Sequence, residues 1–243
     1  DMGVSYGLMA GWNGRQQYFD RSKAGSEGPG AMGYCGDELA GTFVMGNQQN
    51  ESVCHVENIA IAGAYNVLSC SLEALENDYV KPAHYSVIDL MFGLQKDDGH
   101  SLVRYKTFSG RLQNQIITFI KGGGRIMTSG AYIGSDMTLQ KERGFLDEVL
   151  KSGFVSVNRS ASDNVVNGLG ISFDIIRHPN ASHYAAMSVD VLRPSSQGAF
   201  CAMQYADGSD AAVAYDGSDY KAFTMGFPFE CINSLKARRQ VMK

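Results

Sequence analysis

GGGRIMTSGAYIGSD, at residues 122–136, is the stretch of the sequence that decides the fold. Its three glycines predict the end of a helix, and residues 125–129 follow directly as a strand. Gly130 and Gly134 then bracket Tyr132 with the spacing of a nucleophile elbow, a strained turn that lifts one side chain above the edge of a sheet. A glycine-rich turn that serves packing alone explains the same residues. The stretch therefore predicts the geometry of an elbow without fixing its chemistry.

Alternating strands and helices surround this stretch. The segment 85–92 is rich in Val, Ile, Leu, Met and Phe, which is typical of a strand covered by helices on both faces. A shorter apolar segment, 66–70, precedes a helix with Ser71 at its N-cap, and another helix begins after Ser109. Helices are also predicted at residues 51–64 and 142–151. This alternation predicts a parallel sheet.

The last third of the chain has a different pattern, with short β-like stretches separated by Ser, Asn and Gly. Two turn signals, Asp207-Gly208 and Asp216-Gly217, divide its end into a meander. A closing helix is expected near Asn233. The predicted strands are 154–158, 170–176, 200–205, 211–215 and 220–227.

Together these elements predict a single α/β domain with a three-layer, Rossmann-like or flavodoxin-like parallel sheet and a β-rich C-terminal insertion and meander. Its parts are a loop-rich lead-in at residues 1–50, a βαβ core at 51–153, and a β-rich part with the closing helix at 154–243. Because the sequence begins at Asp1 and ends within a predicted helix, we expect a fragment of a longer protein.

Composition excludes several classes of function. The net charge is −4, and the basic residues are scattered except for Lys236, Arg238 and Arg239, so no nucleic-acid partner is expected. The apolar runs fall short of the roughly 20 residues that cross a bilayer, so no membrane span is expected. The five cysteines form no CxxC pair, and His178 and His183 stand alone in a polar loop. We therefore predict neither a metal site nor a cofactor.

Four features occur in an order that resembles the class I glutamine amidotransferase-like fold. They are the strand end 89–93, the helix after Ser109, the stretch at 122–136 and the ending FTMGFPFE at 223–230. The chain resembles more closely a domain of large secreted bacterial proteins described as xanthan lyases. The resemblance covers about residues 60–243, and residues 1–50 match only this narrower group. The resemblance implies a secreted or cell-envelope location and other domains of the parent chain as partners.

The resemblance also implies where catalytic residues would stand. In active members the elbow carries Cys, and a late His-Pro-x-Glu-like segment supplies a base and the acid that orients it. Here Tyr132 occupies the elbow and Phe227 stands near the histidine position, while Glu230 matches the acid. Phenylalanine accepts no proton, and a phenol with a pKa near 10 is a poor nucleophile. The resemblance thus predicts a non-catalytic module.

An enzymatic alternative remains open from the residues alone. A displaced set of Ser135, Asp136 and His183 would allow hydrolysis of a polysaccharide, amide or ester bond. Open α/β sheets bind ligands at the carboxyl ends of their strands. A ligand-binding crevice is accordingly predicted there, formed by Asp89, Gly93, Gly130, Tyr132 and Ser135.

Two further expectations concern the N-terminal part. Trp12, Tyr18, Phe19 and Tyr34 cluster in the glycine-rich lead-in and would suit either stacking on a carbohydrate or packing over the sheet. His55 lies on an apolar helix face, where a satisfied core or surface histidine is the expectation.

Overall fold

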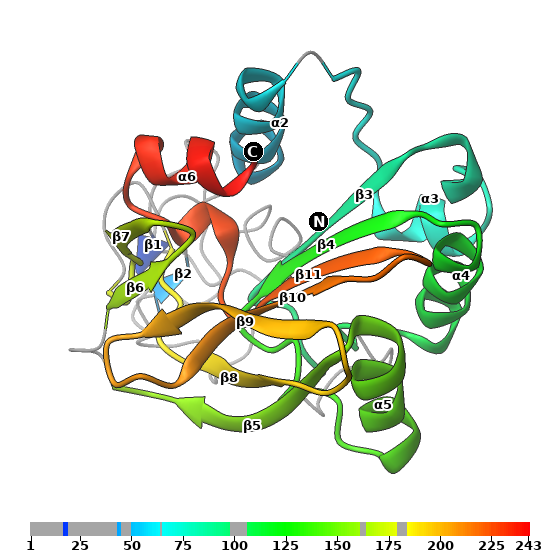
Figure 1. Cartoon of the computed structure of the whole chain (residues 1–243). Helices are drawn as coiled ribbons and strands as arrows, with labels where there is room; N and C mark the ends of the chain where they lie inside the picture. The colour runs from blue at the N-terminus through cyan, green and yellow to red at the C-terminus, as the bar shows by residue number, and fades with distance from the viewer. Residues whose placement is uncertain are drawn as a thin grey trace, which may run out of the picture.

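A seven-stranded sheet runs through the computed structural model, curling from β3 at one edge to β7 at the other (Figure 1). The order of the strands is β3-β4-β11-β10-β9-β6-β7. The structure describes residues 17–18, 43–44, 50–63, 65–97, 106–160, 164–178 and 184–243.

Parallel pairing is confined to one end of this sheet. β3 (Val87–Gly93) pairs with β4 (Arg125–Gly130), and β4 pairs with β11 (Lys221–Met225). In the resulting register Val87, Arg125 and Lys221 lie side by side. The carboxyl ends of these three strands therefore meet at one edge.

The remaining pairings are antiparallel. The other strands of the sheet are β10 (Asp210–Asp216), β9 (Ala199–Tyr205), β6 (Val165–Gly168) and β7 (Ile171–Asp174). A separate ladder joins β5 (Ser152–Asn158) to β8 (Val189–Pro194), and another joins β1 (Gln17–Tyr18) to β2 (Phe43–Val44).

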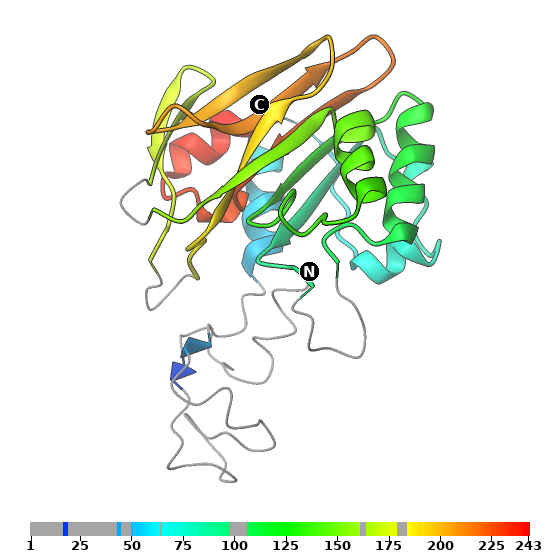
Figure 2. The same cartoon turned by 90° about the horizontal axis from the view of Figure 1, so that it is seen from below.

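Helices pack on both sides of the parallel strands (Figure 2). Along the chain they are α2 (Asn50–Ala62), α3 (Leu72–Glu76), the 3-10 turn η3 (Pro82–His84), α4 (Gly110–Lys121), α5 (Gln140–Phe145), the π-helical turn η4 (Leu146–Leu150), the 3-10 turn η5 (Phe229–Cys231) and α6 (Leu235–Val241).

Two apolar cores lie on opposite faces of the sheet. On one face, α4, α5 and η4 cover alternate residues of the parallel strands, including Leu90, Ile126 and Ala222. On the other face, η5 and α6 pack with the antiparallel strands around Met225 and Phe227. Alternate side chains of a strand point to opposite faces, so Asp89, which neighbours Leu90, projects away from α4.

The structure confirms a mixed α/β fold, but a three-layer parallel Rossmann-like sheet is not shown. Only two of the six pairings within the seven-stranded sheet are parallel. Tight hairpin turns join β6 to β7, β9 to β10 and β10 to β11, and such turns force antiparallel pairing. The prediction of a strand at residues 66–70 is wrong. Those residues are exposed and join no ladder in the described part of the chain, so they lack the burial that the sheet would provide.

Candidate functional site

Tyr132 lies in the turn between β4 and α5, near the carboxyl ends of the parallel strands. Its half-buried ring has the Lys96 ammonium 4.7 Å from its centroid, and its hydroxyl is 3.1 Å from Ser188 Oγ. The backbone of Tyr132 is not in the left-handed region, and α5 starts only at Gln140. The turn is therefore present at the predicted place, without the strain and the immediate helix of a nucleophile elbow.

The backbone donors of this turn are bound by a carboxylate from β8. Asp190 Oδ2 accepts hydrogen bonds from the backbone N–H of Gly134 (2.6 Å) and of Ser135 (2.9 Å). Burial raises the pKa of Asp190 to about 6, against the opposing effect of these two hydrogen bonds. These two N–H groups follow that of Ile133, the residue directly after Tyr132, whose N–H would bind an oxyanion in an acyl-transfer elbow. Asp190 therefore satisfies two backbone donors of the turn within the protein.

Asp136 connects the turn to the segment that follows β3. Its carboxylate accepts hydrogen bonds from the backbone N–H of Thr107 (2.7 Å) and of Asp97 (3.1 Å), and its carbonyl accepts one from Lys106 Nζ (2.6 Å). Both carboxylate oxygens are thus occupied. The residue holds two loops together, which is a structural role.

Gly93 and Gly130 lie side by side, and the backbone N–H of Ala131 donates to Gly93 O (2.9 Å). Gly93 has a φ of +53°, a conformation that favours glycine. A Cβ at this position would lie 3.2 Å from the hydroxyl of Tyr184 and 3.5 Å from Glu230 Oε1. The glycine therefore provides room for a buried polar cluster at the end of β3.

That cluster centres on His55 of α2. His55 Nδ1 is 2.6 Å from Asp89 Oδ2, and His55 Nε2 is 3.1 Å from Glu230 Oε2. The hydroxyl of Tyr184 donates to the other carboxylate oxygen of Glu230. The ring of Phe229 packs edge-on against the imidazole, with 4.6 Å between ring centroids. Three separate parts of the chain, α2, β3 and η5, thus meet at one side chain.

The electrostatics of the cluster favour an imidazolium. Only 2% of His55 is exposed, and burial alone would lower its pKa. The charges and hydrogen bonds of Asp89 and Glu230 outweigh burial and raise the pKa of His55 to about 10. Burial tends to raise the pKa of Glu230, but the hydrogen bond and charge of His55 hold it below its usual value. The three groups form an internal ion cluster.

This arrangement does not fit a proton relay. A histidine that acts as a general base needs one ring nitrogen free to take the proton of a nucleophile. Both ring nitrogens of His55 contact carboxylates. Phe227, near the position where the resemblance implies a histidine, is fully buried. Among the described residues, no hydrogen bond joins the side chain of Ser135 to a histidine.

The structure brings together some of the predicted residues and separates others. Asp89 and Glu230 meet at His55, and Gly93 lies beside Glu230. Tyr132, Ser135 and Asp136 belong to the neighbouring turn. Some predicted residues lie outside the described part of the chain, namely Trp12, Phe19, Tyr34 and His183. Tyr18 is described through its backbone alone, as part of β1.

Sequence reasoning missed the roles of His55, Tyr184 and Asp190. One signal was available for Asp190, because it interrupts the apolar run Val-Asp-Val-Leu of β8. An acidic residue inside a buried strand requires a partner for its charge. Asp89 interrupts β3 in the same way. No comparable signal marks His55 or Tyr184.

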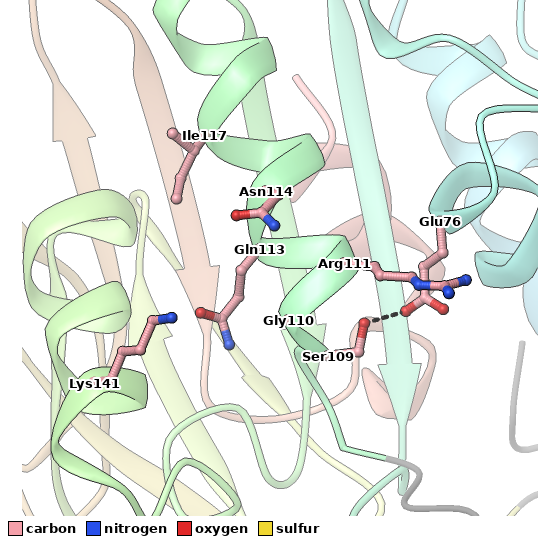
Figure 3. Close-up of a pocket in the computed structure, with 8 residues that line it drawn as sticks. All are labelled: Glu76, Ser109, Gly110, Arg111, Gln113, Asn114, Ile117 and Lys141. Carbon is pink, nitrogen blue, oxygen red and sulfur yellow. Dashed lines mark hydrogen bonds between the residues drawn. The ribbon is translucent and has the colours of Figure 1, made fainter.

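A hollow of about 620 Å³ lies on the outer side of α4, away from these residues (Figure 3). Some of its polar groups are already engaged, since Ser109 Oγ donates to Glu76 and Arg111 donates to Asn77 (2.9 Å). Ser109 also caps α4 by accepting from the N–H of Leu112 (3.1 Å). The hollow contains none of the predicted site residues, so it is a weaker candidate than the strand ends.

Two other kinds of site have no candidate in the described ranges. None of the helices found there has the length and apolar character to cross a bilayer. No group of three or more His, Cys, Asp or Glu residues there is arranged to hold a metal ion.

Comparison with known proteins gives a resemblance of fold alone. No protein-family model and no curated protein matches the sequence. A cytoplasmic protein of Salmonella typhimurium LT2 superposes with a TM-score of 0.50 at 11% identity, over 77% of this chain and 79% of that one. An exo-β-1,4-mannosidase of Opitutaceae bacterium strain TAV5 gives 0.41 at 8% identity, over 62% and 22%. A β-galactosidase of Bacillus circulans gives 0.39 at 11%, over 64% and 21%. The chain thus spans about a fifth of the length of either glycosidase.

Proposed function

We propose that this chain is a non-catalytic, class I glutamine amidotransferase-like module of a secreted or cell-envelope bacterial protein. It contributes architecture, contacts with other domains of the parent chain, or carbohydrate binding. In this proposal β3, β4 and β11 are the remnant of a three-layer Rossmann-like sheet. The parallel pairing of these strands and the helices on both of their faces support it.

One observation carries the proposal: the two pairs of polar groups best placed at the strand ends, the N–H groups of Gly134 and Ser135 and the carboxylates of Asp89 and Glu230, are engaged by the protein itself. Asp190 occupies the N–H groups of Gly134 and Ser135, and His55 occupies Asp89 and Glu230. Catalysis needs such groups aimed at the position of the reacting atoms. Groups that are already paired inside the fold stabilise it instead.

Exposed apolar side chains support a role in contacts with other domains. Within residues 61–87, several large apolar side chains are exposed, including Tyr79 at 83%. Exposed apolar patches commonly mark contact surfaces. The others in this stretch are Ile61, Tyr65, Val67, Leu68, Tyr85 and Val87.

Activity measurements test the absence of catalysis. The purified chain is expected to release no ammonia from glutamine and no acid from simple esters above a protein-free blank. Ser135→Ala and His183→Ala test the displaced set, and His84→Ala, at an exposed histidine, is the matched control. Turnover that Ser135→Ala and His183→Ala abolish and His84→Ala preserves would contradict the proposal and identify a hydrolase.

The full-length sequence tests the setting of the module. A secretion signal together with an attached carbohydrate-active domain is the expected result. A standalone cytosolic chain would contradict the secreted or cell-envelope assignment.

A further inference from the structure

The contact surface of α2 is unusually polar. Over residues 54–62 its two nearly buried side chains are His55 and Asn58, which are 2% and 1% exposed. Val56 and Ile59 are only half-buried, and Ile61 is 47% exposed. A helix normally docks through an apolar stripe. Over residues 54–62, where Cys54 alone is partly buried against the apolar core, apolar burial therefore contributes little to holding α2 on the sheet.

Asn58 adds little to this hold. Its amide nitrogen donates to the Cys54 carbonyl of the same helix (2.7 Å), and its buried Oδ1 has no hydrogen-bond partner among the described residues. A buried acceptor without a partner opposes docking. Among the described residues, the contacts of His55 with Asp89 and Glu230 are then the side-chain hydrogen bonds that link α2 to the sheet and η5.

The connection after α2 allows the helix to move. Residues 65–70 are all exposed and form neither helix nor strand before α3 begins. Six extended residues span about 20 Å. That length permits α2 to leave its place while β3 and the rest of the sheet stay folded.

The groups that surround the His55 ring beneath α2, here called the cation pocket, are suited to hold a cation. The carboxylates of Asp89 and Glu230 contact the two ring nitrogens of His55, Tyr184 donates to Glu230, and Phe229 lines one side. The nearest basic side chain on α6, Arg238, donates to the backbone carbonyls of Ile232 (2.7 Å) and Glu230 (3.4 Å). These hydrogen bonds of Arg238 thus go to backbone carbonyls and to neither carboxylate.

We propose that α2 is a releasable latch. The charged ring of His55 holds the helix against Asp89 and Glu230, and withdrawal of α2 exposes these two carboxylates and Gly93 to solvent. The predicted crevice at the end of β3 is thus closed by the chain itself. This inference goes beyond the non-catalytic role and does not depend on it, because α2 would cover the same groups in an enzyme.

Hydrogen exchange followed by mass spectrometry tests the latch in the whole chain. In the wild type, amides of α2 are expected to exchange through a separate opening that needs little denaturant, while β4 and β11 exchange only on global unfolding. In His55→Gln the protection of α2 is expected to fall at least 100-fold to near none, with β4 and β11 still protected. His84→Ala is the control that leaves α2 protected.

A rescue experiment identifies the pocket. In His55→Ala, millimolar imidazole at a pH where it is protonated is expected to restore protection of α2 several-fold. Pyrazole, a neutral ring of the same size, is expected to restore none. Equal rescue by both rings would contradict a cation pocket.

Hydrogen exchange of α2 in the wild type tests the latch even if the variants fail to fold. Exchange of α2 solely through global unfolding in the wild type would overturn the proposal. Full protection of α2 in folded His55→Gln would overturn it as well.

Discussion

His55→Gln is expected to lower the free energy of unfolding by about 3–5 kcal/mol near neutral pH. The substitution removes the cation between Asp89 and Glu230, of which Glu230 is 1% exposed. Two carboxylates then lie close together without compensation. For a domain of this size the loss corresponds to a decrease in Tm of roughly 10 °C. Chemical denaturation of the two proteins measures it.

The effect depends on pH in a defined direction. Because the pKa of His55 is raised from 6.5 to about 10, its contribution is complete below pH 6.5 and disappears as the pH rises through 10. The difference between wild type and His55→Gln should shrink across this window. The lowered pKa of Glu230 predicts a second loss of stability as the pH falls through that pKa, below 4.5.

His84→Ala provides the control for this prediction, since His84 is exposed on η3 and is expected to change stability by less than about 0.5 kcal/mol. If His55→Gln lowers the free energy of unfolding by no more than His84→Ala does, the contacts of His55 with Asp89 and Glu230 do not stabilise the fold. A difference that stays constant from pH 6.5 to 10 would contradict the charged state of His55.

Asp190→Ala is expected to lower the free energy of unfolding by about 3 kcal/mol, because two backbone N–H groups lose their acceptor, at about 1–3 kcal/mol for each buried donor. These donors belong to Gly134 and Ser135. Asp190→Asn keeps an oxygen in the same place and is expected to cost much less near neutral pH. Comparison of the three proteins by denaturation separates the acceptor from the charge.

Burial raises the pKa of Asp190 from 3.8 to about 6, so the proton is bound more tightly in the folded state. Its stabilising contribution is complete below pH 3.8 and is lost as the pH rises through 6. Wild type should therefore gain up to ~3 kcal/mol over Asp190→Asn as the pH falls from 7 to 4. Asp174→Asn, at an exposed position of β7, should show no such change. If wild type gained the same stability over Asp174→Asn as over Asp190→Asn, the result would contradict a raised pKa of Asp190 as the cause.

Local signals in the sequence account for the elements that were predicted well. The N-cap Ser109 and the glycines after Lys121 set the bounds of α4, and both act within one turn of helix. Gly208, with a φ of +83°, forms the tight turn between β9 and β10. These signals need no knowledge of the rest of the fold.

Contacts between residues far apart in the sequence could not be predicted from these local signals. His55 is 34 residues from Asp89 and 175 residues from Glu230. The parallel pairing of β11 with β4 likewise joins segments almost 100 residues apart. An apolar helix face around His55 looks the same whether the imidazole meets solvent, a backbone group or two carboxylates. Part of the strand-end cluster could therefore be predicted from Asp89, Gly93 and Glu230, but not the histidine at its centre.

Nitrogen-15 NMR of the His55 ring at about pH 8 tests the central claim most directly, since a histidine with an ordinary pKa near 6.5 is neutral there. We predict that both ring nitrogens of His55 carry protons, as donors to Asp89 and Glu230. A neutral ring with one bare nitrogen would contradict this account, because a general base would then stand at the end of β3.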